Sequence, residues 1–251
     1  MKKIVAFTIA DNNNLKYYEM MKNSLRKFHS EEELPLILFG GNDIALTQDR
    51  EIFYRATPVF LNSLIDEYET IVKLDCDQII TGNIAHTWEG EFDVAVVHNS
   101  NPRERAVIEV KVWDIPPEAY LNNGLVVVKS AEFVRHWYKL CYSAHFPQYQ
   151  MREQDLLNIL VYYGNYRVKF LDLSDKWHGL ISKGYWHKIE LRDNKLILPQ
   201  NSETLPIPWP TDGDKEICAI HWAGGANNPE KMNYKTRFQP EVIEYLDKLI
   251  K

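Results

Sequence analysis

The stretch that decides the fold is Ile71-Val72-Lys73-Leu74-Asp75-Cys76-Asp77-Gln78-Ile79-Ile80. Its first residues predict a buried strand, and the apolar residues after the two acids argue against an exposed edge. Residues i and i+2 of an extended chain point to the same side, so Asp75 and Asp77 can aim both carboxylates at one point. Such close carboxylates repel unless a cation lies between them, and oxygen ligands suit Mg²⁺ or Mn²⁺. The alternative is a strand end with two unrelated acids.

Predicted strands and helices alternate around this stretch. Short apolar runs predict strands over residues 4–9, 34–39, 70–74, 92–98, 125–128, 168–171 and 217–221. Helical spacing predicts helices over residues 17–29, 52–68, 131–142, 154–163 and 240–249. Residues 172–210 are expected to be irregular. The alternation predicts βαβ units, and therefore an α/β fold with a mainly parallel central sheet.

Ligands of such sheets bind beyond the carboxyl ends of the strands, where residues 10–14 and 75–77 are expected to meet. The late strand over residues 217–220 leads into His221, and small residues such as Gly224 and Gly225 follow it. An imidazole beside two carboxylates shifts the preference from Mg²⁺ toward Mn²⁺. The small residues would let backbone N–H groups approach a diphosphate. Taken alone, His221 can equally be a hydrogen-bonded histidine at a strand end.

Composition and charge narrow the class of protein. The 251-residue chain has a net charge of −6, which disfavours nucleic acid as a partner because phosphate binding needs a positive face. No apolar run reaches the ~18 residues of a membrane span, and the short run after Met1 predicts a first strand rather than a signal peptide. Cys76, Cys141 and Cys218 are odd in number and widely spaced, which predicts free thiols and a cytoplasmic location.

Four blocks of the sequence, in order, resemble glycosyltransferase family 8, the family of glycogenin and lipopolysaccharide galactosyltransferases. The blocks are Leu74-Asp75-Cys76-Asp77-Gln78-Ile79-Ile80 with Asn83-Ile84, Asn122-Asn123-Gly124-Leu125-Val126-Val127, Glu153-Gln154-Asp155-Leu156-Leu157-Asn158 and His221-Trp222-Ala223-Gly224. The resemblance implies a GT-A fold, the Rossmann-like fold of nucleotide-diphospho-sugar transferases. It also implies one domain over residues 1–251, with a nucleotide-binding half over residues 1–100 and a half for donor sugar and acceptor over residues 101–251.

The same resemblance implies a retaining, metal-dependent hexosyltransferase. UDP-glucose or UDP-galactose would be the donor, and a glycan or another hydroxyl compound the acceptor. Asp75, Asp77 and His221 would bind Mn²⁺, with Mg²⁺ possible. Glu153 and Gln154 would be catalytic, with Gln154 on the face of the anomeric carbon opposite the leaving group, while the donor phosphate takes the acceptor proton. The donor-binding residues would be Thr8, Ala10, Asp11, Asn12, Tyr17, Arg55, Cys76, Asn122, Asn123, Gly224, Gly225 and Lys231.

Three positions depart from the family pattern. Glu153 stands where the family has Asp, which keeps the charge but adds a methylene. The aromatic residue that stacks on the base would fall near Asn14 or Leu15, so Tyr17 or Tyr18 could replace it only with a short shift. The lysine of the family's histidine block aligns with Asn228, and Lys231 could supply that charge. The departures leave the sugar and the base open.

Two other functions stay open at this stage. A haloacid dehalogenase-type phosphatase also carries Asp-x-Asp after a strand, with the first Asp as nucleophile, although normally after its first strand. A non-catalytic module for sugar nucleotides or glycans would keep the site without turnover. Trp177, Trp186 and Trp209 could stack on an acceptor sugar or simply fill the core. The acceptor and the oligomeric state are not predicted.

Overall fold

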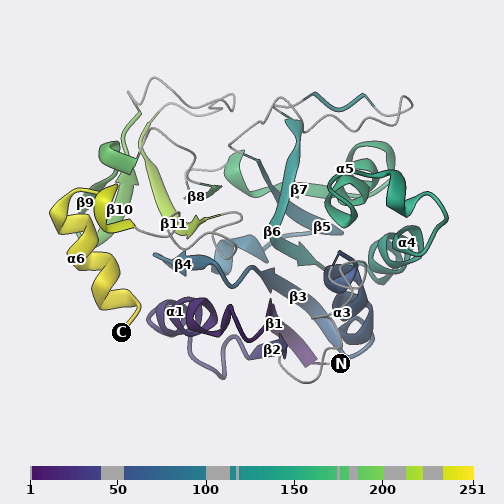
Figure 1. Ribbon diagram of the computed structural model, residues 1–251, viewed down its shortest axis with the longest axis horizontal. Coiled ribbons are helices and arrows are strands. Elements are labelled where there is room, and N and C mark those ends of the chain that lie inside the picture. Colours follow the sequence, from purple (N-terminus) through teal and green to yellow (C-terminus); the bar gives the residue numbers. More distant parts are fainter. Residues whose placement is uncertain are drawn as a thin grey trace.

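The computed structural model describes residues 2–40, 54–99, 114–116, 119–173, 176–180, 186–200, 213–222 and 234–251. Two sheets lie within these residues (Figure 1). One has six strands in the order β2-β1-β3-β6-β5-β7. The other has the order β4-β11-β10-β9, with β8 also paired to β11.

The six-stranded sheet is the parallel core that the sequence predicts. Its strands are β1 (Lys2–Ala10), β2 (Leu36–Gly40), β3 (Tyr68–Leu74), β5 (Val94–His98), β6 (Leu121–Val128) and β7 (Val168–Phe170). β1 pairs in parallel with β2 and β3, and β5 pairs in parallel with β7. β6 runs antiparallel between β3 and β5. Among these strands only β6 is reversed, so the predicted α/β fold with a mainly parallel sheet is confirmed.

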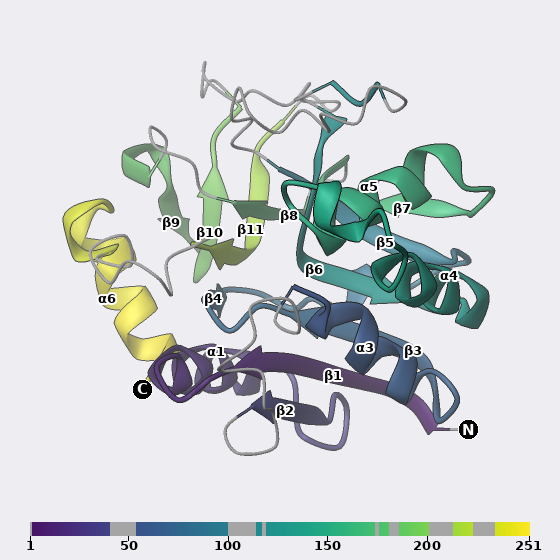
Figure 2. The ribbon, with the colours of Figure 1, turned by 45° about the vertical axis from the view of Figure 1, so that its right-hand side comes forward.

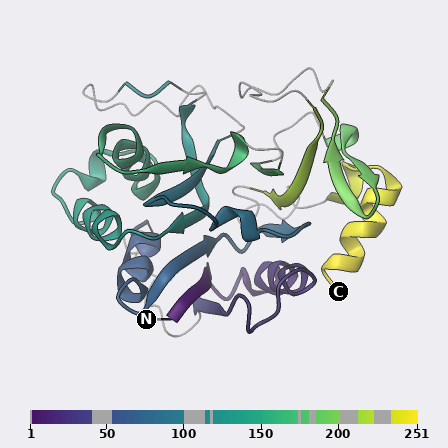
Figure 3. The ribbon, with the colours of Figure 1, turned by 180° about the vertical axis from the view of Figure 1, so that it is seen from behind.

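Helices cover both faces of this sheet (Figures 1 and 3). The helices are α1 (Leu15–Arg26), α3 (Ala56–Leu64), α4 (Ala131–Cys141), α5 (Glu153–Tyr163) and α6 (Pro240–Leu249). One face packs against α3, α4 and α5 in a core that includes Phe133 and Trp137, both fully buried. The other face packs against α1 through Met21 and Leu25. α6 lies against the second sheet through Leu246. Pro58 falls in the first turn of α3, where a missing N–H costs least.

The second sheet corrects the expectation that residues 172–210 are irregular. Its strands are β4 (Gln78–Ile80), β8 (Lys176–Leu180), β9 (Glu190–Arg192), β10 (Lys195–Leu198) and β11 (Lys215–His221), and Figure 2 shows β9, β10 and β11 side by side. β9 and β10 form a hairpin whose turn residues, Asp193 and Asn194, have φ of 48° and 59°. Two positive φ values are typical of a type I′ turn. β9 and β10 are only three and four residues long and alternate in exposure, so an apolar pattern does not reveal them.

Short 3₁₀ segments connect several of these elements. They are η3 (Ala85–Thr87), η5 (Phe146–Gln148), η6 (Leu171–Leu173), η7 (Trp186–Lys188) and η8 (Tyr234–Thr236). Cys76, Cys141 and Cys218 are buried, and the described residues contain no disulfide among them. None of the described helices combines the length and the apolar character that crossing a membrane requires.

Candidate metal and donor site

Asp75 and Asp77 lie where the chain passes from one sheet to the other. β3 ends at Leu74 and β4 begins at Gln78, so three residues make the step. The Asp75 N–H donates to the carbonyl oxygen of Gly124 on β6, at 2.8 Å. The Trp222 N–H, just after β11, donates to the carbonyl oxygen of Asp77, at 3.1 Å. Backbone bonds to both sheets therefore fix the two acids.

His221, the last residue of β11, faces both carboxylates. Its Nε2 lies 3.3 Å from Asp75 Oδ2 and 3.2 Å from Asp77 Oδ1. One ligand atom from each of the three residues lies within 4.8 Å of the others. Nε2 is buried, and these two carboxylates are its only partners among the described residues. A buried imidazole nitrogen that faces two carboxylate oxygens fits a divalent ion such as Mn²⁺. We call Asp75, Asp77 and His221 the trio.

Electrostatic attraction holds the trio together. Burial alone would lower the pKa of His221, but the carboxylates of Asp77 and Asp75 raise it to about 9. Burial alone would raise the pKa of Asp75, but Lys73 and His221 hold it below its ordinary value. The imidazole is therefore protonated at neutral pH in the absence of a metal. A metal ion would take the place of that proton, because only a neutral imidazole can be a ligand.

Lys73 belongs to this site, although sequence reasoning misses it. It precedes Asp75 by two residues on β3 and points to the same side. Its side chain is only 2% exposed. The ammonium donates to Asp75 Oδ1, and also to the carbonyl oxygen of Asn123, at 2.7 Å. A lysine between the apolar residues Val72 and Leu74 marks the position as unusual, but the sequence does not show which groups would partner it.

Gly124 allows β6 to pass directly beside the imidazole. A Cβ atom built on Gly124 would lie 2.2 Å from His221 Cε1 and 2.5 Å from Nδ1. Any other residue would displace the ring, so the glycine is needed for close approach. The Gly124 carbonyl also accepts from Gln78 Nε2 at 2.7 Å, which ties β4 to β6. This gives a physical reason for the glycine in the Asn122-Asn123-Gly124 block.

Asn122, Asn123, Glu153 and Gln154, which we call the amide cluster, lie next to the trio. Asn123 Nδ2 donates to Glu153 Oε1 at 3.2 Å, and the Asn123 N–H donates to Gln154 Oε1 at 3.3 Å. Asn122 Nδ2 donates more weakly to the same Gln154 oxygen, at 3.5 Å. Asn122 Oδ1 accepts from the Gly124 N–H at 2.7 Å. The structure thus brings together four of the predicted site residues.

Contacts from neighbouring elements fix the start of α5. Asn158, one turn further along, accepts from the Leu121 N–H at 2.7 Å and donates to the Leu121 carbonyl at 3.1 Å. Trp137 Nε1 donates to the Glu153 carbonyl at 2.9 Å. Arg152, just before the helix, has a φ of 53°, a conformation that non-glycine residues seldom adopt. Glu153 and Gln154 are therefore held at a fixed point beside β6.

Glu153 has an unusual carboxyl group. Burial raises its pKa to about 8, although the Asn123 hydrogen bond and the charge of Lys73 oppose the shift. Its Oε2 is buried and has no partner among the described residues. At neutral pH the carboxyl is mostly protonated, so it can donate a hydrogen bond as well as accept one.

Other predicted donor-binding residues lie at the end of β1. Thr8 is fully buried, and its hydroxyl has no partner within the described part of the chain. Ala10 is also buried, and its carbonyl would lie 1.8 Å from a Cβ on Gly40. Asp11 Oδ1 accepts from the backbone N–H groups of residues 13 and 14, each at 3.0 Å, and so shapes the turn before α1. Asn12 is exposed in this turn.

Three expectations about donor contacts change. Tyr17 is only 4% exposed and packs with Ala10 and Cys76, so its ring has little surface left for stacking on a base. Cys76 also packs into this core, and burial followed by the charge of Asp77 raises the pKa of its thiol, which leaves its backbone as the part available to a ligand. Arg55 Nε donates to the Cys141 carbonyl at 2.8 Å, which engages this side chain at the end of α4.

For the remaining predicted residues, either the whole residue or its side chain is not described. Gly224, Gly225 and Lys231 lie outside the described residues, as does Trp209, and the side chains of Trp177 and Trp186 are not described either.

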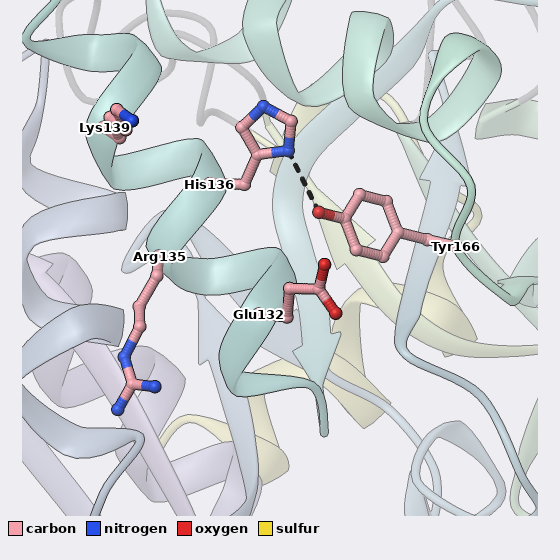
Figure 4. A pocket seen from close by; sticks show the side chains of 5 residues that line it. All are labelled: Glu132, Arg135, His136, Lys139 and Tyr166. Atoms are coloured by element: carbon pink, nitrogen blue, oxygen red, sulfur yellow. Dashed lines mark hydrogen bonds between the residues drawn. The ribbon is translucent and has the colours of Figure 1, made fainter.

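A depression of about 390 Å³ lies on the outer side of α4 (Figure 4). Its lining residues are Glu132, Arg135, His136, Lys139 and Tyr166. His136 Nδ1 and Tyr166 Oη are 3.0 Å apart, as Figure 4 shows. Arg135 is engaged with Asp66 at 2.6 Å. No residue of the trio or of the amide cluster lines this depression, so it is a separate surface feature.

Comparison with solved structures identifies the fold. The galactosyltransferase LgtC, in complex with donor and acceptor sugar analogues, superposes with a TM-score of 0.64 over 98% of this chain and 96% of that chain, at 13% identity. The chain has the GT-A glycosyltransferase fold. This confirms the fold that the four sequence blocks imply, and the likeness to LgtC is consistent with a resemblance to family 8.

Two further glycosyltransferases share the GT-A fold with this chain. One, involved in glycosylating the major capsid of PBCV-1, has a TM-score of 0.56 and 13% identity over 93% of this chain and 99% of that chain. The bifunctional glycosyltransferase WbbM has a TM-score of 0.53 and 13% identity over 100% of this chain and 52% of that chain. No family model and no curated protein matches the sequence.

Proposed function

We propose that this chain is a metal-dependent hexosyltransferase. It takes the sugar from a nucleotide-diphosphate donor, with UDP-glucose and UDP-galactose as the leading candidates, and transfers it with retention to a hydroxyl group of a glycan or similar acceptor. The proposal includes one catalytic domain over residues 1–251, with the nucleotide side in residues 1–100 and the sugar and acceptor side in residues 101–251.

One observation carries this proposal: the buried imidazole of His221 converges with two carboxylates, and its Nε2 lies 3.3 and 3.2 Å from oxygens of Asp75 and Asp77. The three side chains come from two sheets and converge beyond the carboxyl end of β3, where ligands of α/β sheets bind. Acidic residues with only a structural role would gain nothing from converging in this way, because bringing two carboxylates together costs electrostatic repulsion and desolvation. The glycosyltransferase fold makes a diphosphate-bound cation the fitting occupant.

Asp75, Asp77 and His221 would hold Mn²⁺ or Mg²⁺. When bound, this ion would offset charge that develops on the departing diphosphate, a contribution of several kcal/mol in metal-assisted reactions. The residues of the amide cluster would orient the donor sugar, with Gln154 near the anomeric carbon. The protonated Glu153 carboxyl would donate a hydrogen bond to a sugar hydroxyl. Fixing the sugar in this way removes orientational freedom before reaction, itself a large contribution.

The competing functions predict different products. A phosphatase would use Asp75 as a nucleophile, but Lys73 and His221 each engage one oxygen of that carboxylate, and the fold is that of glycosyltransferases. A non-catalytic binding module would share the fold and the trio. Turnover therefore separates this alternative from a transferase.

The test is donor hydrolysis without an acceptor. Purified protein is incubated with each of a panel of UDP-sugars, with and without Mn²⁺, and release of UDP and free sugar is followed. We expect slow, Mn²⁺-dependent hydrolysis of one or two hexose donors, and retention at the anomeric carbon by NMR. Binding without turnover would identify a binding module, and phosphate release from monoesters a phosphatase.

Asp75→Asn and Asp77→Asn should each abolish hydrolysis while circular dichroism shows a folded protein. The matched control is Asp66→Asn, because the Asp66 side chain is 74% exposed and pairs with Arg135 rather than with the trio. Full activity of either trio variant at saturating Mn²⁺ would overturn the metal assignment.

A further inference from the structure

Lys73 is a charged side chain in a place that normally excludes charge. Its neighbours on β3, Val72 and Leu74, are fully buried, and Lys73 itself is 2% exposed. Burying an ammonium group costs free energy unless strong partners compensate for the lost water. Both observed partners belong to the candidate site: Asp75 Oδ1 and the carbonyl oxygen of Asn123, the latter at 2.7 Å.

Because of the Lys73 ammonium, the two carboxylate oxygens of Asp75 have different partners. Oδ1 is bonded to Lys73, whereas Oδ2 faces His221 Nε2 at 3.3 Å. A carboxylate without this partner could rotate and present both oxygens to a cation. With Lys73 in place, only Oδ2 points toward the atoms of Asp77 and His221.

Lys73 also changes the charge that a metal ion would meet. Asp75 and Asp77 together carry two negative charges, and the ammonium cancels one of them within hydrogen-bond distance. In a buried site, charges a few ångströms apart interact strongly. The repulsion between the ammonium and a divalent ion therefore works against metal binding on its own. The negative charge of a donor diphosphate would reverse this balance, since it attracts both cations.

We propose that Lys73 is a positioning residue that makes metal binding dependent on the nucleotide. Its ammonium fixes Asp75 so that one oxygen faces the metal, and it lowers the negative charge of the trio. The metal then binds weakly alone and tightly together with a nucleoside diphosphate. This inference rests on the proposed function, because it assumes that the trio binds a divalent ion.

The experiment measures Mn²⁺ binding by isothermal titration calorimetry, with and without UDP, in the wild type and in Lys73→Met. We expect Mn²⁺ alone to bind at least ~10-fold tighter to Lys73→Met, since a nearby positive charge is removed. The factor by which UDP strengthens Mn²⁺ binding should shrink by a similar amount. Lys73→Arg keeps the charge and should stay within about threefold of the wild type in both measurements.

Lys169→Met is the matched control. Lys169 is also a strand lysine whose ammonium donates to carbonyl oxygens, those of His86 and Glu89 at 2.5 and 2.8 Å. This variant loses the same charge away from the trio and should bind Mn²⁺ like the wild type. Thermal melting in every variant checks that the fold is retained, and Lys73→Gln, closer to lysine in polarity, replaces Lys73→Met if the latter does not fold.

The outcomes separate this inference from the proposed function. If Lys73→Met binds Mn²⁺ equally or more weakly in the absence of UDP, the positioning role is wrong, while the metal site itself stands. If the wild type binds no Mn²⁺ even with UDP, the metal-dependent function fails and this inference fails with it.

Discussion

The trio and the amide cluster both lie beside Gly124 and differ in how their polar atoms are satisfied. In the trio, His221 Nε2 is paired only with the carboxylates of Asp75 and Asp77 among the described residues. In the amide cluster, Asn122, Asn123 and Gln154 bond to one another and to the backbone. An imidazole held by charge alone can exchange its proton for a metal ion, whereas side chains that hydrogen-bond to one another are already fixed in orientation. The first region therefore supplies chemistry and the second supplies orientation.

The largest expected effect comes from removing a ligand of the trio. His221→Ala should lower Mn²⁺-dependent donor hydrolysis by about a thousandfold or more, because several kcal/mol of charge stabilisation are lost. It should also abolish Mn²⁺ binding in calorimetry. His136→Ala, at the separate depression on α4, is the control and should leave both unchanged. Equal losses in the two variants would mean that the trio has no special role.

The next effect concerns the residue between the two regions. Gly124→Ala places a Cβ 2.2 Å from His221 Cε1 and 2.7 Å from Asn122 Oδ1, so both regions must shift. We expect Mn²⁺ affinity to fall at least ~10-fold and the free energy of unfolding to fall by about 1–3 kcal/mol, as in overpacked cores. Gly82→Ala, whose added Cβ meets Cys218 Sγ at 3.3 Å, is the milder control. Unchanged metal binding in Gly124→Ala would show that the imidazole moves freely.

The pH dependence of stability tests the amide cluster alone. Because burial raises the pKa of Glu153 from 4.5 to about 8, the folded chain binds this proton more tightly than the unfolded chain. The resulting stability is complete below pH 4.5 and is lost as the pH rises toward 8. Glu153→Gln, which mimics the protonated group, should therefore melt progressively higher than the wild type between pH 5 and pH 8. Glu67→Gln, an exposed control, should show no such trend.

The smallest effect is expected from a single bond within the amide cluster. Asn123→Ala removes the 3.2 Å hydrogen bond to Glu153 Oε1 and should cost about 1 kcal/mol of stability. Donor hydrolysis should fall by less than about tenfold, since the other bonds of the cluster remain. Asn23→Ala loses a comparable bond to the Ile250 carbonyl, at 3.0 Å, and should cost similar stability with no loss of activity. A loss of activity in Asn123→Ala as large as that in His221→Ala would contradict the division between the regions.

The sequence predicts the six-stranded sheet well because its strands are long or strongly apolar. β3 and β6 are buried almost throughout, so hydrophobic runs identify them. The hairpin of β9 and β10 escapes prediction, because three or four residues with alternating exposure carry too little pattern. Its only local signal is the pair Asp193-Asn194, a turn sequence that tolerates positive φ.

The residues of the site likewise fall into those that the sequence predicts and those that it does not. The spacing of Asp75 and Asp77 already predicts two convergent carboxylates, and the four-block resemblance adds His221 and the amide cluster. Lys73 escapes prediction because its burial depends on its partner Asn123, fifty positions away on β6. The same holds for Arg55, whose direction is set by the carbonyl at the end of α4. Contacts between distant segments decide both side chains, and no local pattern encodes them.

The three-residue step between β3 and β4 has a mechanical consequence. Asp75 and Asp77 lie in the three-residue segment that connects the two sheets, and His221 ends β11 of the second sheet. An ion bound by all three side chains would link the two sheets to each other. Unfolding by heat or denaturant would then require the bound ion to dissociate before the two sheets could separate. The thermal or denaturant stability of the whole molecule would therefore report whether an ion is bound at this site.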